Sequence, residues 1–264
     1  MIQIIHVILK FKKVLILGLI LLFSSFFVNA QESSETLFSK GNTAYNESDY
    51  SKAVKFYEQI IENGQHSAEL YYNLGNAYYR LSQVAESIYF FEKAKLLAPE
   101  NQDIQINSSF ANNMTIDAIE PLPQSQLAQI KNKIFEFLSV DSWSKITLGF
   151  LWIFAVLLLV YFFVQTVSLK RNFFFLSIVC LFLFIGSFSV TFSKNADLKQ
   201  NQYAILFSKQ IDTWSEPNQQ GDLLFTLHEG TKVQVLDSLA EWKKIRIANG
   251  SEGWLINASL RNLN

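Results

Sequence analysis

The sequence predicts a multidomain membrane protein built from an all-α repeat solenoid, a two-helix transmembrane hairpin and a small all-β barrel. Three observations lead to this prediction. Residues 34–101 repeat with a period of 34, residues 146–192 hold two apolar runs around a short polar turn, and residues 198–264 alternate with a period of two. The first pattern is typical of paired-helix repeats and the last of strands. A chain of 264 residues also has room for two soluble domains beside its membrane segments.

Residues 1–30 have the composition of a secretory signal. Three lysines precede the apolar run 14–28, and the small residue Ala30 comes before a polar stretch. A charged, an apolar and a small-residue segment in this order predict a cleaved signal peptide, with an uncleaved signal anchor as the alternative. Both interpretations export the chain from residue 31 onward.

The repeats 34–67 and 68–101 align residue by residue, and each is predicted to be a pair of helices. Residues 103–114 are expected to form a capping helix, so that this domain spans 34–114. Glycine inside a helix costs about 1 kcal/mol relative to alanine, so a repeated glycine indicates close helix contact. The positions interpreted as the structural signature of the repeat are Gly41, Ala53, Gly75, Ala94 and Pro99.

This signature resembles the tetratricopeptide repeat, with a small residue at the eighth place, aromatic residues at the eleventh or twelfth, and proline near the end. The resemblance implies a solenoid that binds proteins along the first helix of each repeat. Asn42, Asn73 and Asn76 are the candidate partner-binding residues. Family members that clamp a C-terminal carboxylate add basic residues, but the matching places here hold Phe38, Asp103 and Asn107. Carboxylate clamping is therefore not expected.

Residues 115–145 are predicted to lead the chain to the membrane. Pro121 and Pro123 favour an extended linker, because proline disfavours helix at the preceding residue. Apolar residues then recur at a spacing of three and four, at Leu127, Ile130, Ile134, Phe137 and Leu138. The pattern predicts an amphipathic helix in the membrane interface, and packing back on the repeats is the alternative.

Residues 146–169 and 173–193 are predicted to span the membrane, with a turn at 168–172. A span needs about 20 apolar residues, and neither run holds a charge. A soluble-core interpretation fails because helices apolar all round need complete burial, for which little chain remains. The short turn returns the chain to one side. With the export signal, it predicts a membrane protein whose soluble domains both face the periplasm or the exterior.

Residues 198–264 are predicted to hold five short strands, at 204–207, 223–227, 232–237, 242–247 and 253–256, with residues 213–217 as a loop. Asn249-Gly250 is a strong hairpin signal. The pattern resembles the bacterial SH3-like domain, through Leu224, Leu227, Gly230, Val233, Val235, Trp242, Ile245, Gly253 and Trp254. The resemblance implies a small barrel that binds a peptide or cell-wall material. Trp214 is the candidate binding residue, whereas Trp242 and Trp254 are interpreted as core.

Composition argues against several other functions. The net charge is −1, which gives no indication of nucleic-acid binding. The single cysteine, Cys180, permits no disulfide within the chain, and the three histidines have no metal-ligand spacing. Neither span contains an ionisable residue, which argues against a transporter. We found no catalytic motif, so neither enzymatic activity nor a cofactor is expected.

The order of the whole chain resembles the BatE-type proteins of the Bacteroides aerotolerance operon. That resemblance implies an accessory protein of the bacterial inner (cytoplasmic) membrane, with both soluble domains on the periplasmic side. Its implied role is envelope assembly or stress tolerance. Its partners would be membrane proteins with von Willebrand factor A domains and other repeat proteins of the operon, beside the lipid bilayer and, as a further ligand, the cell wall. An extracytoplasmic sensor of the wall or of a ligand, acting through the SH3-like domain, is the alternative.

Overall fold

The computed structural model describes residues 28–263, with side chains from Ser34 onward. The chain divides into two compact units, residues 1–66 and 67–264. Residues 1–27 of the predicted signal lie outside the described residues, and helix α2 begins directly after them at Val28. We describe each unit by itself.

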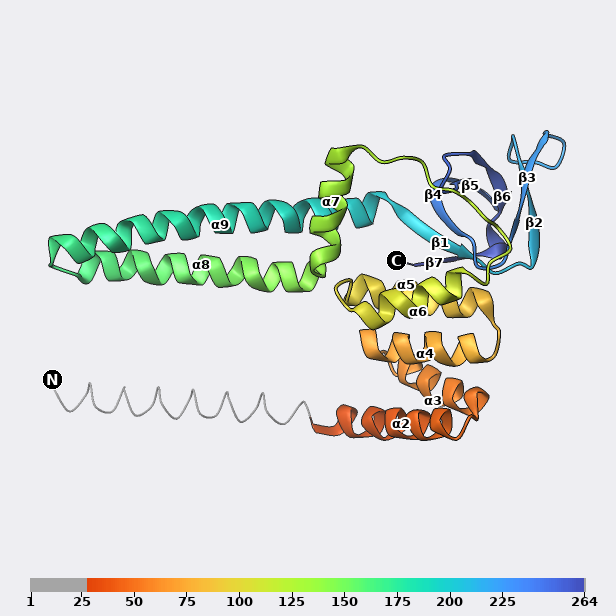
Figure 1. Cartoon of the computed structure of the whole chain (residues 1–264), viewed down its shortest axis with the longest axis horizontal. Helices are drawn as coiled ribbons and strands as arrows, with labels where there is room; N and C mark the ends of the chain where they lie inside the picture. The colour runs from red at the N-terminus through yellow and green to blue at the C-terminus, as the bar shows by residue number, and fades with distance from the viewer. Residues whose placement is uncertain (1–27, 264) are drawn as a thin grey trace. The chain divides into compact units, whose positions relative to one another are not determined.

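The first unit contains one helix pair, α2 (Val28–Asn46) and α3 (Tyr50–Glu62) (Figure 1). The Asp49 carboxylate caps α3 by accepting a hydrogen bond from the Lys52 backbone N–H at 3.2 Å. Gly41 allows the close approach of the two helices, because a Cβ at this position would collide with the ring of Tyr57. Ala53 is fully buried at the same contact.

The second unit begins with α4 (Ala68–Arg80), α5 (Val84–Leu97) and α6 (Gln102–Asn112). The glycine contact recurs 34 residues later, since a Cβ at Gly75 would lie 2.8 Å from the ring of Phe91. The Ser87 hydroxyl donates a hydrogen bond to the Gly75 carbonyl at 2.9 Å. Ala94 is also fully buried. Helix pairs thus occupy both segments predicted to be repeats, and α6 occupies the segment predicted to cap them.

A helical hairpin follows, made of α8 (Val140–Phe163) and α9 (Val167–Gln200), which lie side by side (Figure 1). Both helices are long and apolar enough to cross a membrane, by length and composition. Most of their apolar side chains are exposed, with Trp152 at 71% and Phe182 at 69%. No protein core covers them among the described residues.

The hairpin turn differs in position from the prediction at residues 168–172. The structure places it at residues 164–166, with Thr166 as the residue before α9. Lys170 and Arg171 therefore lie in the first turns of α9. Polar residues alone do not end a helix, and this stretch contains neither glycine nor proline to do so. At the other end, α9 runs past the predicted span to Gln200.

Helix α7 (Gln126–Phe137) precedes the hairpin and contacts α9. Its N-cap is Ser125, whose hydroxyl accepts from the Ala128 N–H at 3.3 Å. None of its residues is buried, and Leu127 is 80% exposed. This exposure disfavours the alternative in which the helix packs its apolar face back on the repeats.

The C-terminal residues form one antiparallel sheet with strand order β3-β2-β6-β5-β4-β1-β7. Its strands are β1 (Gln202–Leu206), β2 (Gln210–Trp214), β3 (Leu223–His228), β4 (Lys232–Leu239), β5 (Trp242–Arg246), β6 (Glu252–Ile256) and β7 (Leu260–Asn262), with a 3₁₀ turn η1 (Asn257–Ser259) before β7. We call residues 202–263 the sheet domain. Its core holds Ala204, Leu206, Leu227, Val233, Ile245, Ile247 and Leu255.

All five predicted strands are present, and β2 and β7 are additional. The sequence prediction assigned residues 213–217 to a loop, whereas Thr213 and Trp214 end strand β2. Thr213 is fully buried, and β2 pairs with both β3 and β6. The turn-forming residues from Ser215 onward led the prediction to extend the loop too far back.

The sheet domain packs against the second repeat, which the sequence did not predict. Ile205 of β1 and Leu263 share a buried apolar cluster with Ala85, Ile88 and Phe91 of α5. The Lys93 ammonium of α5 donates a hydrogen bond to the Leu263 carbonyl at 3.1 Å. Repeat and sheet thus bury apolar surface against each other within one unit.

Candidate functional site

The three candidate asparagines lie on the first helices of the repeats, as predicted. Asn42 is half-buried on α2, where its side-chain oxygen accepts a hydrogen bond from the Tyr57 hydroxyl at 2.7 Å. Asn73 and Asn76 are half-buried on α4, and their spacing of three residues places them on one helix face. The structure therefore brings Asn73 and Asn76 together, while Asn42 belongs to the other unit.

Asn76 also contributes to the internal structure. Its side-chain oxygen accepts a hydrogen bond from the Asn107 side-chain amide at 2.9 Å, and the same amide donates to the Tyr72 hydroxyl at 2.8 Å. Asn107 stands at a place where carboxylate-clamping relatives carry a basic residue. Here it joins α6 to α4, so the cap and the candidate binding face form one polar network.

Trp214 is half-buried at the end of β2, not in a loop. It pairs directly with Trp254 of β6, and residues opposite each other on paired strands point to the same face of a sheet. Trp254 is likewise half-buried, whereas Trp242 is buried as predicted. Trp214 and Trp254 therefore stand opposite each other on one face of the sheet, and both are half-buried.

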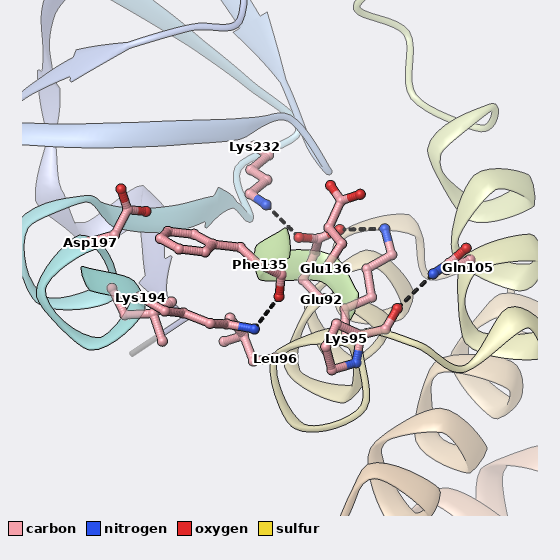
Figure 2. Close-up of a pocket in the computed structure, with 11 residues that line it drawn as sticks. Glu92, Lys95, Leu96, Gln105, Phe135, Glu136, Lys194, Asp197 and Lys232 are labelled. Carbon is pink, nitrogen blue, oxygen red and sulfur yellow. Dashed lines mark hydrogen bonds and ion pairs between the residues drawn. The ribbon is translucent and has the colours of Figure 1, made fainter. Parts of the chain in front are cut away.

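A pocket of about 480 Å³ lies where α5, α6, α7, α9 and β4 meet (Figure 2), and no sequence pattern predicted it. Its walls combine charged side chains with the apolar residues Leu96, Phe135 and Leu198. The charged residues lining it are Glu92, Lys95, Glu136, Lys194, Asp197 and Lys232. A volume of several hundred Å³ is in the range of small-molecule sites.

Glu92 is a buried charge at this pocket, with 8% of its surface exposed. Its two carboxylate oxygens bind Lys95 at 2.9 Å and Lys232 of β4 at 2.5 Å, as Figure 2 shows. Burial alone would raise the pKa of Glu92, but the charges and hydrogen bonds of Lys232 and Lys95 outweigh it and lower the pKa to about 2. Glu92 therefore stays ionised and joins α5 to the sheet domain.

Lys194 joins α9 to the end of α7. Its ammonium donates hydrogen bonds to the Phe135 carbonyl and, at 2.6 Å, to the Leu138 carbonyl. The last carbonyls of a helix lack intrahelical donors, and a cation at this end is also favoured by the helix dipole. Lys131 of α7 pairs with Asp197 of α9 at 2.5 Å. These contacts hold α7 across the end of the apolar hairpin.

The linker is attached to the sheet domain through Asp117. One carboxylate oxygen accepts from the His228 backbone N–H at 2.7 Å and from the Thr231 hydroxyl at 2.6 Å, and the other contacts the His228 ring at 2.7 Å. Burial raises the pKa of Asp117, but the hydrogen bonds from Thr231 and His228 lower it overall. Further along, the Leu122 N–H donates to the Ala248 carbonyl at 3.1 Å.

Comparison with protein families agrees with this architecture. Models of the tetratricopeptide repeat match residues 34–63 and 68–101. The model of the bacterial SH3 domain matches residues 215–261. The chain contains tetratricopeptide repeats and a bacterial SH3 domain. A search of curated proteins found no match.

These families define the kind of function. Tetratricopeptide repeats and SH3-like domains suggest protein–protein interaction, and no catalytic family matches the chain. Among the residues that the structure describes, no group of three or more His, Cys, Asp or Glu side chains could hold a metal ion. The candidate binding sites in the described part of the chain are the α4 face, the facing residues Trp214 and Trp254, and the charged pocket.

Proposed function

We propose that this protein is a membrane-anchored scaffold that gathers partner proteins in the bacterial envelope. The observation that carries the proposal is the combination of two interaction modules with a hairpin of apolar helices whose side chains are exposed. Helices of this length and apolarity favour insertion by several kcal/mol, at roughly 0.3 to 0.6 kcal/mol for each Leu, Ile, Phe or Val. Lipid is the solvent that suits such surfaces.

The hairpin supports a single working side for both modules. The repeats precede α8 and the SH3 domain follows α9, so a membrane-spanning hairpin returns the chain to the side from which it entered. The charged, apolar and small-residue order at residues 1–30 favours export. Both modules would then face the periplasm from the inner membrane.

The α4 face is the surface we assign to partner proteins. Asn73 and Asn76 lie one turn apart, and asparagine amides can donate to and accept from the backbone of an extended peptide. The Asn107 and Tyr72 contacts hold this face in place, which reduces the entropy lost on binding. By resemblance to BatE-type proteins, the partners would be membrane proteins with von Willebrand factor A domains and other repeat proteins, and the role would be envelope assembly or stress tolerance.

Affinity purification of the full chain after in-cell crosslinking tests the scaffold. Wild type should recover integral membrane proteins, and the double variant Asn73→Ala, Asn76→Ala should recover them at least tenfold less. Gln59→Ala is the control, because Gln59 is an exposed amide on the second helix of the first repeat. Recovery of no protein partner by the wild type, or equal recovery by the double variant, contradicts the proposal.

Labelling with a membrane-impermeant maleimide tests the topology in a Cys180→Ser background. Ser251→Cys lies at an exposed position in the sheet domain, and Gln165→Cys lies in the hairpin turn. Intact cells with a permeabilised outer membrane should label the first and spare the second. The reverse labelling pattern would contradict the periplasmic assignment.

A second candidate function is recognition of a cell-wall component or ligand by the SH3 domain. The specific observation in its favour is that Trp214 and Trp254 are both half-buried and stand opposite each other on one sheet face, since aromatic side chains line the grooves in which SH3 domains bind peptides. The solubilised full chain should then sediment with purified peptidoglycan, and Trp214→Ala should abolish this. If the chain sediments with peptidoglycan and the affinity purification recovers no protein partner, wall recognition becomes the favoured function.

A further inference from the structure

The charged pocket begins where the apolar part of α9 ends. Lys194, Asp197 and Leu198 line it from one turn of that helix, and Phe192 is the last large apolar residue before them. At 1.5 Å of rise per residue, these three lie about 3 to 9 Å beyond the apolar run. The headgroup layer occupies roughly that depth outside a 30 Å hydrocarbon core. If α9 spans the membrane, the pocket therefore lies at the depth of the lipid headgroups.

The lysine ammonium groups at the pocket outnumber the carboxylates that pair with them. Lys95 and Lys232 share the single carboxylate of Glu92, which leaves that group with one net positive charge. Asp197 is already paired with Lys131. Lys194 binds two carbonyls, and in the described part of the chain no ion pair joins it to a carboxylate. Counting the Glu136 carboxylate, which also lines the pocket, one net positive charge remains for an anion.

The two lysines also have hydrogen-bond donors to spare. An ammonium group carries three N–H donors. Lys194 uses two of them on the Phe135 and Leu138 carbonyls, and Lys95 uses one on Glu92. Phosphate oxygens are strong acceptors for such donors, because charge-assisted hydrogen bonds are about twice as strong as neutral ones.

The remaining walls suit a lipid more than a free ion. Leu96, Phe135 and Leu198 provide an apolar surface next to the ammonium groups, which a small hydrated anion would not need. Glu136 also lines the pocket, and it forms no ion pair within residues 28–263. Its carboxylate would attract an ammonium and repel a headgroup that carries only negative charge.

We propose that this pocket binds the headgroup of a membrane phospholipid, with Lys95 and Lys194 donating to its phosphate and Glu136 favouring a headgroup with an ammonium, such as phosphatidylethanolamine. The lipid would bind where the second repeat, the apolar hairpin and the SH3 domain meet. The inference rests on the proposed function, because it requires α8 and α9 to lie in the bilayer.

Native mass spectrometry of the detergent-solubilised full chain tests the site with added phosphatidylethanolamine or phosphatidylglycerol. Wild type should retain one phosphatidylethanolamine and prefer it to phosphatidylglycerol, and Glu136→Gln should remove this preference. Lys194→Gln and Lys95→Gln should each weaken retention about tenfold, as expected for a lost charged hydrogen bond. Lys95 lies on α5 and does not hold α7, so this variant reports on the pocket without releasing that helix. Lys199→Gln is the matched control, an exposed lysine on α9 outside the pocket.

The source of the phosphate is decided by competition with inorganic phosphate and glycerol 3-phosphate at millimolar concentration. Persistence of the bound lipid supports the proposal, whereas displacement by either soluble anion assigns the pocket to a soluble phosphate and overturns it. Equal lipid retention by wild type, Lys95→Gln and Lys194→Gln also overturns it.

Membrane fractionation separates this inference from the scaffold proposal. Recovery of the full chain in the soluble fraction would contradict membrane anchoring itself. Recovery in the membrane fraction together with an empty pocket would contradict only the lipid site.

Discussion

The two repeats share one signature but use their second helices differently. Gly41 against Tyr57 and Gly75 against Phe91 are the same contact, 34 residues apart. In the first repeat, α3 buries a single stripe, Ala53, Val54, Tyr57 and Ile60. In the second, α5 buries residues on most of its circumference, Ala85, Ser87, Ile88, Phe90, Phe91, Glu92 and Ala94.

The difference lies in what covers α5. One side of it contacts α4, as α3 contacts α2, and α6 and the sheet domain contact other sides. The glutamates at matching positions illustrate the change: Glu58 is half-buried, whereas Glu92 is buried between two lysines. A repeat period therefore specifies the contact within a repeat, and additional buried positions reveal a neighbour from outside the array.

Truncating the matching apolar residues should have the largest effect. Ile88 is 1% exposed and belongs to the cluster shared with the sheet domain, and Val54 stands at the same place in the first repeat. We expect Ile88→Ala to cost about 4 kcal/mol, and Val54→Ala roughly 2 kcal/mol. Hydrogen exchange should rise in β1 and β7 with Ile88→Ala alone. Faster exchange in these strands with Val54→Ala would contradict the distinction.

Acid should weaken the second unit through Glu92. Its folded pKa of about 2 lies below the ordinary value of 4.5, so its contribution is complete above pH 4.5 and is lost as the pH falls towards 2. The shift corresponds to about 3 kcal/mol, at 1.36 kcal/mol for each pKa unit. When the free energy of unfolding is measured against pH, Glu92→Gln should show a smaller decrease between pH 4.5 and 2 than the wild type. Glu58→Gln, the matched control, should keep the slope; an identical slope in both variants would remove Glu92 as the cause.

Releasing the linker should have a smaller effect. Asp117→Asn removes the charge that accepts from the His228 N–H and the Thr231 hydroxyl, and we expect a loss of about 2 kcal/mol. Glu120→Gln, on the exposed part of the same linker, should stay within about 0.5 kcal/mol. Thermal unfolding of the full chain in detergent compares the two. A similar melting temperature for both would show that the linker contact contributes little.

The helix caps provide the smallest test. Asp49 caps α3, whereas Gln83, its counterpart before α5, forms no side-chain cap. We expect Asp49→Gln to destabilise the first repeat by about 1 kcal/mol and Gln83→Asp to stabilise the second by up to about 1 kcal/mol. Denaturant unfolding followed by hydrogen exchange in each repeat measures both. The two substitutions must change the free energy of unfolding in opposite directions. A stabilising effect of Asp49→Gln would contradict the capping role.

Local periodicity was sufficient to predict the repeats, the capping helix and the apolar hairpin. The glycines and aromatic residues recur at fixed spacing, and two uncharged runs need no tertiary information to be recognised. The sheet was predicted less completely. Strand β2 was missed because its last residues, Thr213 and Trp214, were assigned to the loop 213–217, and β7 is too short to show alternation.

The pocket and the packing of the SH3 domain on α5 were not predictable in this way. The Glu92–Lys232 pair joins residues 140 apart, and Asp117 meets His228 across 111 residues. Such pairs leave no periodic trace in a single sequence. One signal was present in α5, where apolar residues surround the helix and a glutamate interrupts them, a pattern that a helix with one buried face does not need.

Helix α9 has a mechanical consequence. It runs for 34 residues without interruption and ends at Gln200, and β1 begins at Gln202. At 1.5 Å per residue it is about 50 Å long, so some 20 Å would extend beyond a 30 Å hydrocarbon core. A single residue separates this rod from the sheet. With α9 in a bilayer, as we propose, a tilt of this rod would turn the SH3 domain and the second repeat with it.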